Sequence, residues 1–348
     1  MKKSSFLHLL PIPLLLLLLL LLAMTSMCEA SAGDRDERYR QCVSQCVVLK
    51  CEPDQARGGA MARRYLYRQG FVATVEDEEW AAGWAERLLG WSCDENCRYE
   101  CAHKNAATRR SGGERPAQYH GKWAFTRVLG VQELFSTVFS VLNAVPHLLF
   151  LSHARAPLQP HSSSRLLFHW RSWAAMGLNA WFWSAVFHSR DTAFTEKMDY
   201  FSAYLLIVWG LWVAIVRTLD VRGVRSQALV LAALLAWYGC HVGYLSIVRF
   251  DYGYNMQVNV ATAVLASVFW LAWLSLHRER PYARLYLCAI LGVYPMSLLE
   301  LLDFSPVLGL VDAHALWHLS TVPFCFLTYA AVKADLSFPE ESETHKTA

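Results

Sequence analysis

Two histidines, His314 and His318, stand four residues apart at the start of an apolar run that continues to Val332. On a helix, residues at positions i and i+4 lie one above the other on the same face. The run is long enough to cross a membrane, and imidazoles that face lipid are costly. The pair is therefore expected to face the protein interior, where it could either bridge packed helices or bind a metal ion.

A second group of polar residues favours the metal interpretation. Ser184 and His188 end one predicted span, and Asp199 lies near the start of the next. In the topology described below they share one membrane face with the histidine pair, roughly 5–10 Å below the surface at about 1.5 Å per residue. A catalytic zinc takes three protein ligands and leaves a position for water, whose pKa it lowers. The predicted roles are zinc binding by His188, His314 and His318, general base at Asp199 and oxyanion donor at Ser184.

Several of these residues also have a structural interpretation. Ser184 could bond a carbonyl of its own helix, and Asp199 could cap the following span. Glu133, near the end of the first span, could support the site. Asp191 and Asp312 lie in predicted loops, where solvation or capping is the commoner role and support of the site the rarer one.

Other polar residues of the spans are interpreted as packing residues. Ser140 and Asn143 in the first span are expected to join helices by hydrogen bonds. His147 and Cys325 are expected to pack inside the bundle or lie at its interface. The sequence contains no G-x-S-x-G elbow, P-loop or dinucleotide fingerprint, which argues against a serine esterase or a nucleotide enzyme.

Composition predicts an all-α, polytopic membrane protein. The 348 residues are 55% hydrophobic and only 18% charged, and the apolar residues come in blocks of about twenty. A net charge of +3 gives no reason to expect a nucleic-acid partner. Seven transmembrane helices are predicted, at about 128–152, 166–188, 197–217, 227–249, 256–276, 283–302 and 313–332.

The first 30 residues have the pattern of a secretory signal peptide. Lys2 and Lys3 precede a leucine run, and Cys28-Glu29-Ala30 ends in a small residue after which cleavage is expected. An uncleaved anchor is the alternative. A cleaved signal peptide and an uncleaved anchor would both deliver the residues that follow to the lumen.

Residues 31–122 are predicted to form a small disulfide-rich lumenal domain followed, from residue 103, by a basic linker. Six cysteines in an oxidising compartment indicate three disulfides, with 15 possible connectivities, and the helical spacings suggest two stapled helices. A zinc cluster is the less favoured alternative. Trp80, Trp84, Leu88 and Trp91 form a stripe expected to supply the core of this domain. The cysteines are Cys42, Cys46, Cys51, Cys93, Cys97 and Cys101.

The charges of the loops predict the orientation of the helical domain, residues 123–333. The loops on the side opposite the cysteine-rich domain hold eight basic residues, and the other loops between spans hold three. This bias follows the positive-inside rule, so the tail at 334–348 is predicted to be cytosolic. The eight are Arg155, Arg165, Arg217, Arg222, Arg225, Arg278, Arg280 and Arg284, and the three are Arg190, Lys197 and Arg249.

The motifs resemble those of the CREST superfamily of seven-span hydrolases, which includes alkaline ceramidases and progestin/adiponectin-type receptors. The shared pattern is Ser184-x3-His188-x10-Asp199 with a closing His314-x3-His318. The cysteine-rich domain, the run E-L-F-S-T-V-F-S-V-L-N and the run H-S-R-D-T-x-x-T-E-x-x-D-Y are similar to the post-GPI attachment to proteins factor 3 family, over essentially the whole mature chain.

The resemblance implies fatty-acid remodelling of GPI-anchored proteins in the Golgi membrane, by zinc-dependent release of the sn-2 fatty acid from the anchor's phosphatidylinositol. The partners it implies are GPI-anchored proteins and membrane lipid. A ceramidase-like amide hydrolase and a non-catalytic receptor or chaperone for GPI-anchored cargo are the alternatives. The tail lacks a double-lysine retrieval signal, which favours the Golgi over the endoplasmic reticulum.

Overall fold

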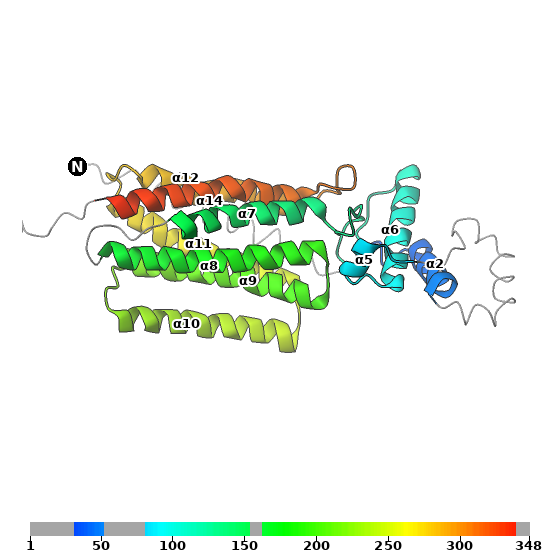
Figure 1. Cartoon of the computed structure of the whole chain (residues 1–348), viewed down its shortest axis with the longest axis horizontal. Helices are drawn as coiled ribbons and strands as arrows, with labels where there is room; N and C mark the ends of the chain where they lie inside the picture. Colours follow the sequence, from blue (N-terminus) through cyan, green and yellow to red (C-terminus); the bar gives the residue numbers. More distant parts are fainter. Residues whose placement is uncertain (1–30, 52–80, 154–161, 339–348) are drawn as a thin grey trace, which may run out of the picture. The chain divides into compact units, whose positions relative to one another are not determined.

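The computed structural model describes residues 31–51, 81–153 and 162–338 (Figure 1). Within these ranges the chain is helical apart from turns, loops and isolated β-bridges. The described residues fall into two compact units, an N-terminal unit that runs to Leu134 and also includes Phe304–Asp312, and a helical unit formed by the remainder. The predicted signal peptide, Trp80 and residues 339–348 of the predicted tail lie outside the described residues.

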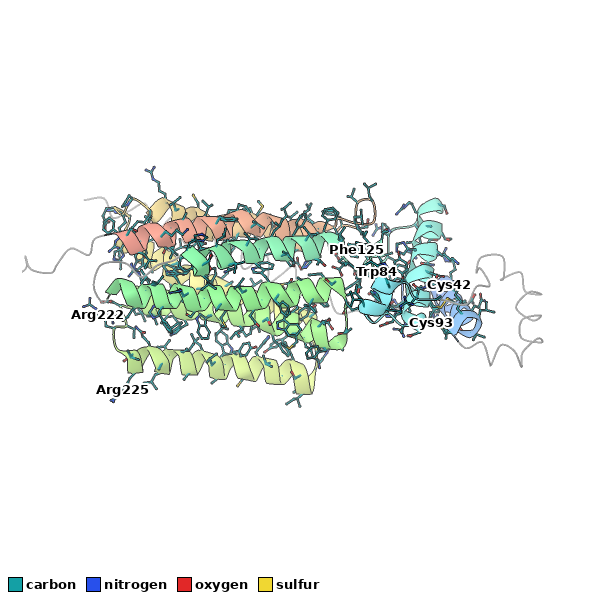
Figure 2. The ribbon with its side chains drawn as sticks, in the orientation of Figure 1. Cys42, Trp84, Cys93, Phe125, Arg222 and Arg225 are labelled. Atoms are coloured by element: carbon teal, nitrogen blue, oxygen red, sulfur yellow. A yellow bond between two sulfur atoms is a disulfide. The ribbon has the colours of Figure 1, made fainter. Side chains whose placement is uncertain are left out.

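The N-terminal unit is built on two helices joined by three disulfides, as predicted. Helix α2 (Glu37–Cys46) continues into the π-helix η2 (Val47–Cys51), and α6 (Cys93–Ser111) lies against both. Asp36 caps α2, and Glu95 bonds the backbone of Ser92 at the start of α6. The pairing is nested, and it occupies all six sulfurs, so no zinc cluster forms here. The pairs are Cys42–Cys101, Cys46–Cys97 and Cys51–Cys93, with Cys42 and Cys93 labelled in Figure 2.

The prediction that the aromatic stripe forms the core of this unit is wrong for Trp84 and Leu88. Trp84 and Leu88 lie on the five-residue helix α5 (Trp84–Leu88) and are 67% and 78% exposed. Only Trp91 is buried, with its indole N–H donating to Gly130 O at 2.8 Å. The core consists instead of cysteines packed with Tyr39 and Tyr119. Disulfides stabilise a small domain that buries little apolar surface, so the stripe is not needed as a core.

The predicted basic linker is folded rather than a free tether. Helix α6 continues to Ser111, and Arg109 near its end donates to Asp36 at 3.0 Å. Arg38 also donates to Asp36, and this bond holds the pKa of the Asp36 carboxyl well below its usual value. Tyr119 is buried with its ring 4.8 Å from that of Tyr39. Specific ion pairs and apolar burial therefore order a segment whose composition predicts either a solvated tether or a surface for phosphate-bearing headgroups.

Seven long apolar segments follow, one of them divided in two. Six have both the length and the apolar composition to cross a membrane. Helix α8 has 28 residues, but polar side chains such as Arg171 and Asn179 make it less apolar. The chain is therefore a polytopic membrane protein, as predicted. The helices are α7 (Leu134–His153), α8 (Ser162–Ser189), α9 (Ala193–Thr218), α10 (Val224–Gly243) continued by the π-helix η4 (Tyr244–Val248), α11 (Tyr252–Leu276), α12 (Ala283–Met296), α13 (Leu298–Leu302) and α14 (Ala313–Ser337).

Two predicted spans differ from the helices that form. The first was expected from residue 128, but Val128 and Val131 pair across a tight turn and α7 begins only at Leu134. The sixth is divided at Ser297 into α12 and α13, two residues after Pro295, which has no N–H to continue the helical hydrogen bonds. The second difference matters for the site, because α13 is a short, separately placed helix.

One end of the helical unit is held by a buried carboxylate. Asp335 of α14 accepts from Arg217 at 2.8 Å, at the end of α9, and is also bonded by Tyr282 at the start of α12. Arg222 and Arg225, labelled in Figure 2, lie at this end. The loops with the larger share of arginines therefore meet at one end of the bundle, in agreement with the predicted alternation of the helices. The assignment of that end to the cytosol stays a prediction.

Candidate metal centre

The three predicted ligand histidines meet at the other end of the helical unit. His188 lies in the last turn of α8, and His314 and His318 lie in the first two turns of α14. His188 and His318 are 2% and 5% exposed, whereas the side chain of His314 is 35% exposed. The trio is thus buried on two sides and accessible through His314.

The imidazole nitrogens of the trio point towards one another. The Nε2 atom of His314 lies 2.9 Å from Nε2 of His318 and 3.3 Å from Nε2 of His188. One ring nitrogen from each residue falls within 4.8 Å of the other two. Residues that are 126 positions apart in the chain therefore present their nitrogens to a single small volume.

A carboxylate that sequence reasoning missed anchors His314. Glu300 of α13 lies with Oε2 2.8 Å from Nδ1 of His314, and its other oxygen accepts from the Tyr252 hydroxyl at 3.0 Å. Because the carboxylate only accepts, the proton between them belongs to Nδ1, and Nε2 of His314 carries a lone pair. The signal was available in the sequence, since Glu300 is a lone carboxylate between two leucine pairs, a position where a charge is expensive and commonly functional.

Ser140 of α7 anchors His318 in the same way. Its hydroxyl donates to Ser136 O at 2.7 Å, so its oxygen accepts from its other two partners. These are Nδ1 of His318 and Oγ of Ser184, each 3.0 Å away. Nδ1 of His318 is therefore the protonated nitrogen, and its Nε2 also carries a lone pair. The prediction that Ser140 joins helices is confirmed, and the bond additionally orients a histidine.

The donor set fits a metal ion. Two imidazole lone pairs 2.9 Å apart repel each other, and a cation bound by both nitrogens would remove this repulsion. Both rings are held by their outer nitrogens, to a carboxylate and to a hydroxyl, which is how protein metal sites fix the tautomer and direction of a histidine ligand. Three histidines with one exposed edge match the ligand count of a zinc site that keeps an open position.

Asn143 extends this support to the backbone of α14. Its side-chain amide donates to His318 O at 2.7 Å, and its oxygen accepts from the Thr321 hydroxyl at 3.0 Å. The amide therefore ties α7 to α14 at the turn that carries His318, which confirms the predicted role of Asn143 in helix packing.

The two predicted catalytic residues lie on α8, which also carries His188, and on α9, which packs against α8. Ser184 is buried one turn before His188, and its bond to Ser140 crosses from α8 to α7 rather than closing on its own helix. Asp199 lies in the second turn of α9 and is partly buried. The oxyanion role of Ser184 and the base role of Asp199 stay predictions.

The three supporting acids lie in different surroundings. Glu133 is buried in the N-terminal unit and forms an ion pair with Lys122. Asp191 is partly buried in the connection between α8 and α9, where Thr192 rather than Asp191 caps α9. Asp312 is buried and is the last residue of the N-terminal unit before α14. Support of the site by these three residues stays a prediction.

The fold and the trio together define a multi-pass helical membrane protein with a three-histidine candidate metal centre. The profile of the Per1-like family matches residues 83–336. The chain belongs to the Per1-like family.

Characterised relatives match over nearly their whole length. A Bos taurus protein named GPI-specific phospholipase A2-like PGAP3 is 38% identical over 322 residues, 91% of this chain and 93% of its own. The Homo sapiens protein of the same name is 38% identical over 320 residues, 91% of this chain and 93% of its own. A Drosophila melanogaster protein named post-GPI attachment to proteins factor 3 is 38% identical over 313 residues, 89% of this chain and 91% of its own. No solved structure matches the chain.

Proposed function

We propose that this protein is a zinc-dependent lipid hydrolase that remodels GPI-anchored proteins by cleaving the sn-2 acyl ester of the anchor's phosphatidylinositol. The observation that carries the proposal is the convergence of three Nε2 atoms, together with the contacts that Glu300 and Ser140 make to the outer nitrogens of His314 and His318. The names of the relatives, which refer to GPI and to phospholipase A2, support the substrate class.

The depth of the trio suits an ester of a membrane lipid. His188 lies one residue from the end of α8, and His314 is the second residue of α14. At about 1.5 Å per residue, His318 lies only some 8 Å inside the end of its helix. Glycerol esters lie just below the headgroups, so the scissile bond meets the trio without leaving the bilayer. We place this end in the lumen of the Golgi, on the side of the N-terminal unit.

His188, His314 and His318 would hold the zinc ion. Zinc, when bound, supplies a Lewis acid that polarises the ester carbonyl and makes water acidic enough to attack at neutral pH. Glu300 keeps the proton of His314 on Nδ1, and Ser140 does the same for His318. The ligand nitrogens therefore stay unprotonated and correctly aimed throughout turnover.

Proton transfer and charge stabilisation fall to Asp199 and Ser184 in this proposal. The Asp199 carboxylate takes a proton from the attacking water and returns it to the departing glycerol oxygen. The Ser184 hydroxyl, which bonds Ser140 in the structure, turns to donate to the ester oxygen as negative charge develops there. The C–O bond of the ester breaks, and a free fatty acid and a lyso-anchor are the products.

The test is zinc content together with fatty-acid release, measured on the purified full chain with a purified GPI-anchored protein as substrate. His188→Ala and His314→Ala should each lose the metal and the release of the sn-2 fatty acid while keeping the disulfides and the elution volume of the parent. His153→Ala, at the exposed end of α7, is the matched control and should keep both.

Three results would contradict the proposal. Normal fatty-acid release by His314→Ala would remove the trio from the chemistry. Metal binding without fatty-acid release would favour a receptor or chaperone for GPI-anchored cargo. Turnover of ceramide without release from the GPI substrate would favour an amide hydrolase.

A further inference from the structure

The N-terminal unit exposes a group of large apolar side chains. Five residues of three segments are exposed by between 60% and 88%. They come from α5, from the turn at 128–131 and from the loop at 307–311. Such residues are ordinary when scattered but indicate an interaction surface when they gather. The five are Trp84, Leu88, Leu129, Val307 and Leu308, and Trp84 is labelled in Figure 2.

The three segments are in contact, so the five side chains belong to one region. Gly130 lies so close to α5 that a Cβ there would be 3.1 Å from the carbonyl carbon of Ala85, the neighbour of Trp84. Thr126, just before the first turn, donates its backbone N–H to Gly309 O of the second loop at 2.8 Å. Trp84 and Leu88 share a face of α5 because they are four residues apart. We name these five residues the apolar rim.

The backbone makes the two exposed leucines unusual. Leu129 and Gly130 have φ of 51° and 76° between the paired residues Val128 and Val131, the pattern of a type I′ turn. That turn favours Asn-Gly, because a bulky residue at positive φ is strained. Leu308 and Gly309 repeat the pattern with φ of 55° and 72°. Each loop thus places an exposed leucine where a small polar residue fits the backbone better.

A third turn of the same unit provides the internal comparison. His120 and Gly121 have φ of 51° and 80° between the paired residues Tyr119 and Lys122. Its tip residue is polar and bonds to other parts of the unit, with the backbone N–H of His120 donating to Asp34 at 2.9 Å. The fold therefore does not require leucine at such a tip. Leucine recurs at the tip of two turns, whereas the third has histidine, a residue type enriched at positive φ, and this difference points to a use for the leucines.

Chain continuity identifies what covers the rim. Only four residues separate Leu129 from Leu134, where α7 begins, and four separate Leu308 from Ala313, where α14 begins. Both helices have the length and composition of membrane spans. Both leucines therefore stand within a few residues of the points where the chain enters lipid, and Trp84 is of the residue type enriched at that boundary.

We propose that the apolar rim inserts into the lipid layer on the side of the membrane where α7 and α14 begin. The partner is the bilayer itself, at the level where headgroups meet acyl chains, rather than a second protein. Insertion removes the two leucines from water. It also anchors the N-terminal unit to the membrane directly, in addition to the peptide chain that joins this unit to α7 and α14. The proposal is independent of the chemistry of the histidine trio.

The experiment places a photoreactive side chain on the full protein reconstituted in phosphatidylcholine vesicles. Leu129→p-benzoylphenylalanine and Leu308→p-benzoylphenylalanine should yield phosphatidylcholine adducts after irradiation, detected by mass spectrometry of the tryptic peptide. Leu148→p-benzoylphenylalanine on the exposed face of α7 is the positive control for lipid. His120→p-benzoylphenylalanine is the matched negative control, because it has the same turn with a polar tip. Absence of lipid adducts at 129 and 308 alongside adducts at 148 would overturn the proposal, as would crosslinks from these positions to another copy of the chain.

A second variant separates insertion from folding. Leu129→Asn combined with Leu308→Asn gives both turns the residue that their backbone favours, so the N-terminal unit should remain folded with its three disulfides. The lipid adduct from Trp84→p-benzoylphenylalanine should then fall several-fold, whereas His120→Asn should leave it unchanged. An undiminished adduct in the double asparagine variant would show that the leucines do not hold the rim in lipid.

Discussion

The histidine trio and the buried His147 of α7 differ in where their ring nitrogens point. In the trio, the outer nitrogens of His314 and His318 are held by Glu300 and Ser140, and the inner nitrogens face each other. His147, deeper along the same helices, lies 2.6 Å from the Tyr329 hydroxyl through Nδ1 and 3.5 Å from the Cys325 sulfur through Nε2.

The comparison shows what distinguishes a histidine that can bind metal from one that packs. Both nitrogens of His147 have neutral partners that can donate or accept as the ring requires, so the ring is satisfied as it stands. A ring 5.2 Å from that of Trp173 and a close contact with Gly177 complete its packing. In the trio, the lone pairs of His314 and His318 are directed at each other, as they would be around a shared metal ion. Burial does not separate the two cases, because His188 and His318 are about as buried as His147.

The largest effect on zinc affinity is expected from removing a histidine of the trio. Removing the buried ring of His147 should instead lower stability. His318→Ala should lower zinc affinity by more than about 100-fold, beyond the range seen when only a partner of a ligand is lost. His147→Gln should lower the thermal midpoint but leave zinc affinity within about twofold, because it removes no ligand. Metal analysis and thermal melts of both purified variants make the measurement. Equal zinc loss in the two variants would contradict the assignment of His318 as a metal ligand and His147 as a packing residue.

A smaller effect is expected at the carboxylate that anchors His314. Glu300→Gln keeps the shape of the side chain but removes its charge, so zinc affinity should fall by about 10- to 100-fold. Tyr252→Phe removes only the bond from tyrosine to Glu300 and should cost less. Competition with a zinc chelator measures both constants. Unchanged affinity in Glu300→Gln would show that this carboxylate does not tune the ligand.

The smallest effect is expected at the partner of His147. Tyr329→Phe removes one buried hydrogen bond and should destabilise the protein by about 0.5–1.5 kcal/mol. Zinc affinity and fatty-acid release should be unchanged. Denaturation in detergent, compared with the same metal and activity assays, tests this. A loss of zinc in Tyr329→Phe would mean that the packing of His147 reaches the trio.

Much of the architecture was predictable because lipid and disulfides constrain it strongly. Blocks of about twenty apolar residues can only be helices in a membrane, so the spans were found to within a few residues except where local turns intervene. Apolar periodicity does not encode the backbone dihedral angles of such turns, so the predicted start of α7 is six residues too early. Cysteine spacing predicted two helices joined by disulfides. The nested pairing itself could be seen only in the structure.

The convergence of the three histidines was predictable from the sequence, but the residues that hold His314 and His318 were not. His314 and His318 can be identified in the sequence because they have helical spacing within an apolar run. Glu300 escaped notice because its partner is 14 residues away across a loop, a separation that no periodicity encodes. Trp84 and Leu88 were misjudged for a related reason, since amphipathic spacing identifies an apolar face without saying whether protein or lipid covers it.

The last helix is entered directly from the N-terminal unit. Phe304–Asp312 belongs to that unit, and His314 follows Asp312 by only two residues. Only two peptide bonds separate Asp312, the last residue of that unit, from His314 of the trio. The main chain that enters the first turn of α14 therefore belongs both to the disulfide-bonded unit and to the helix that carries two of the three histidines.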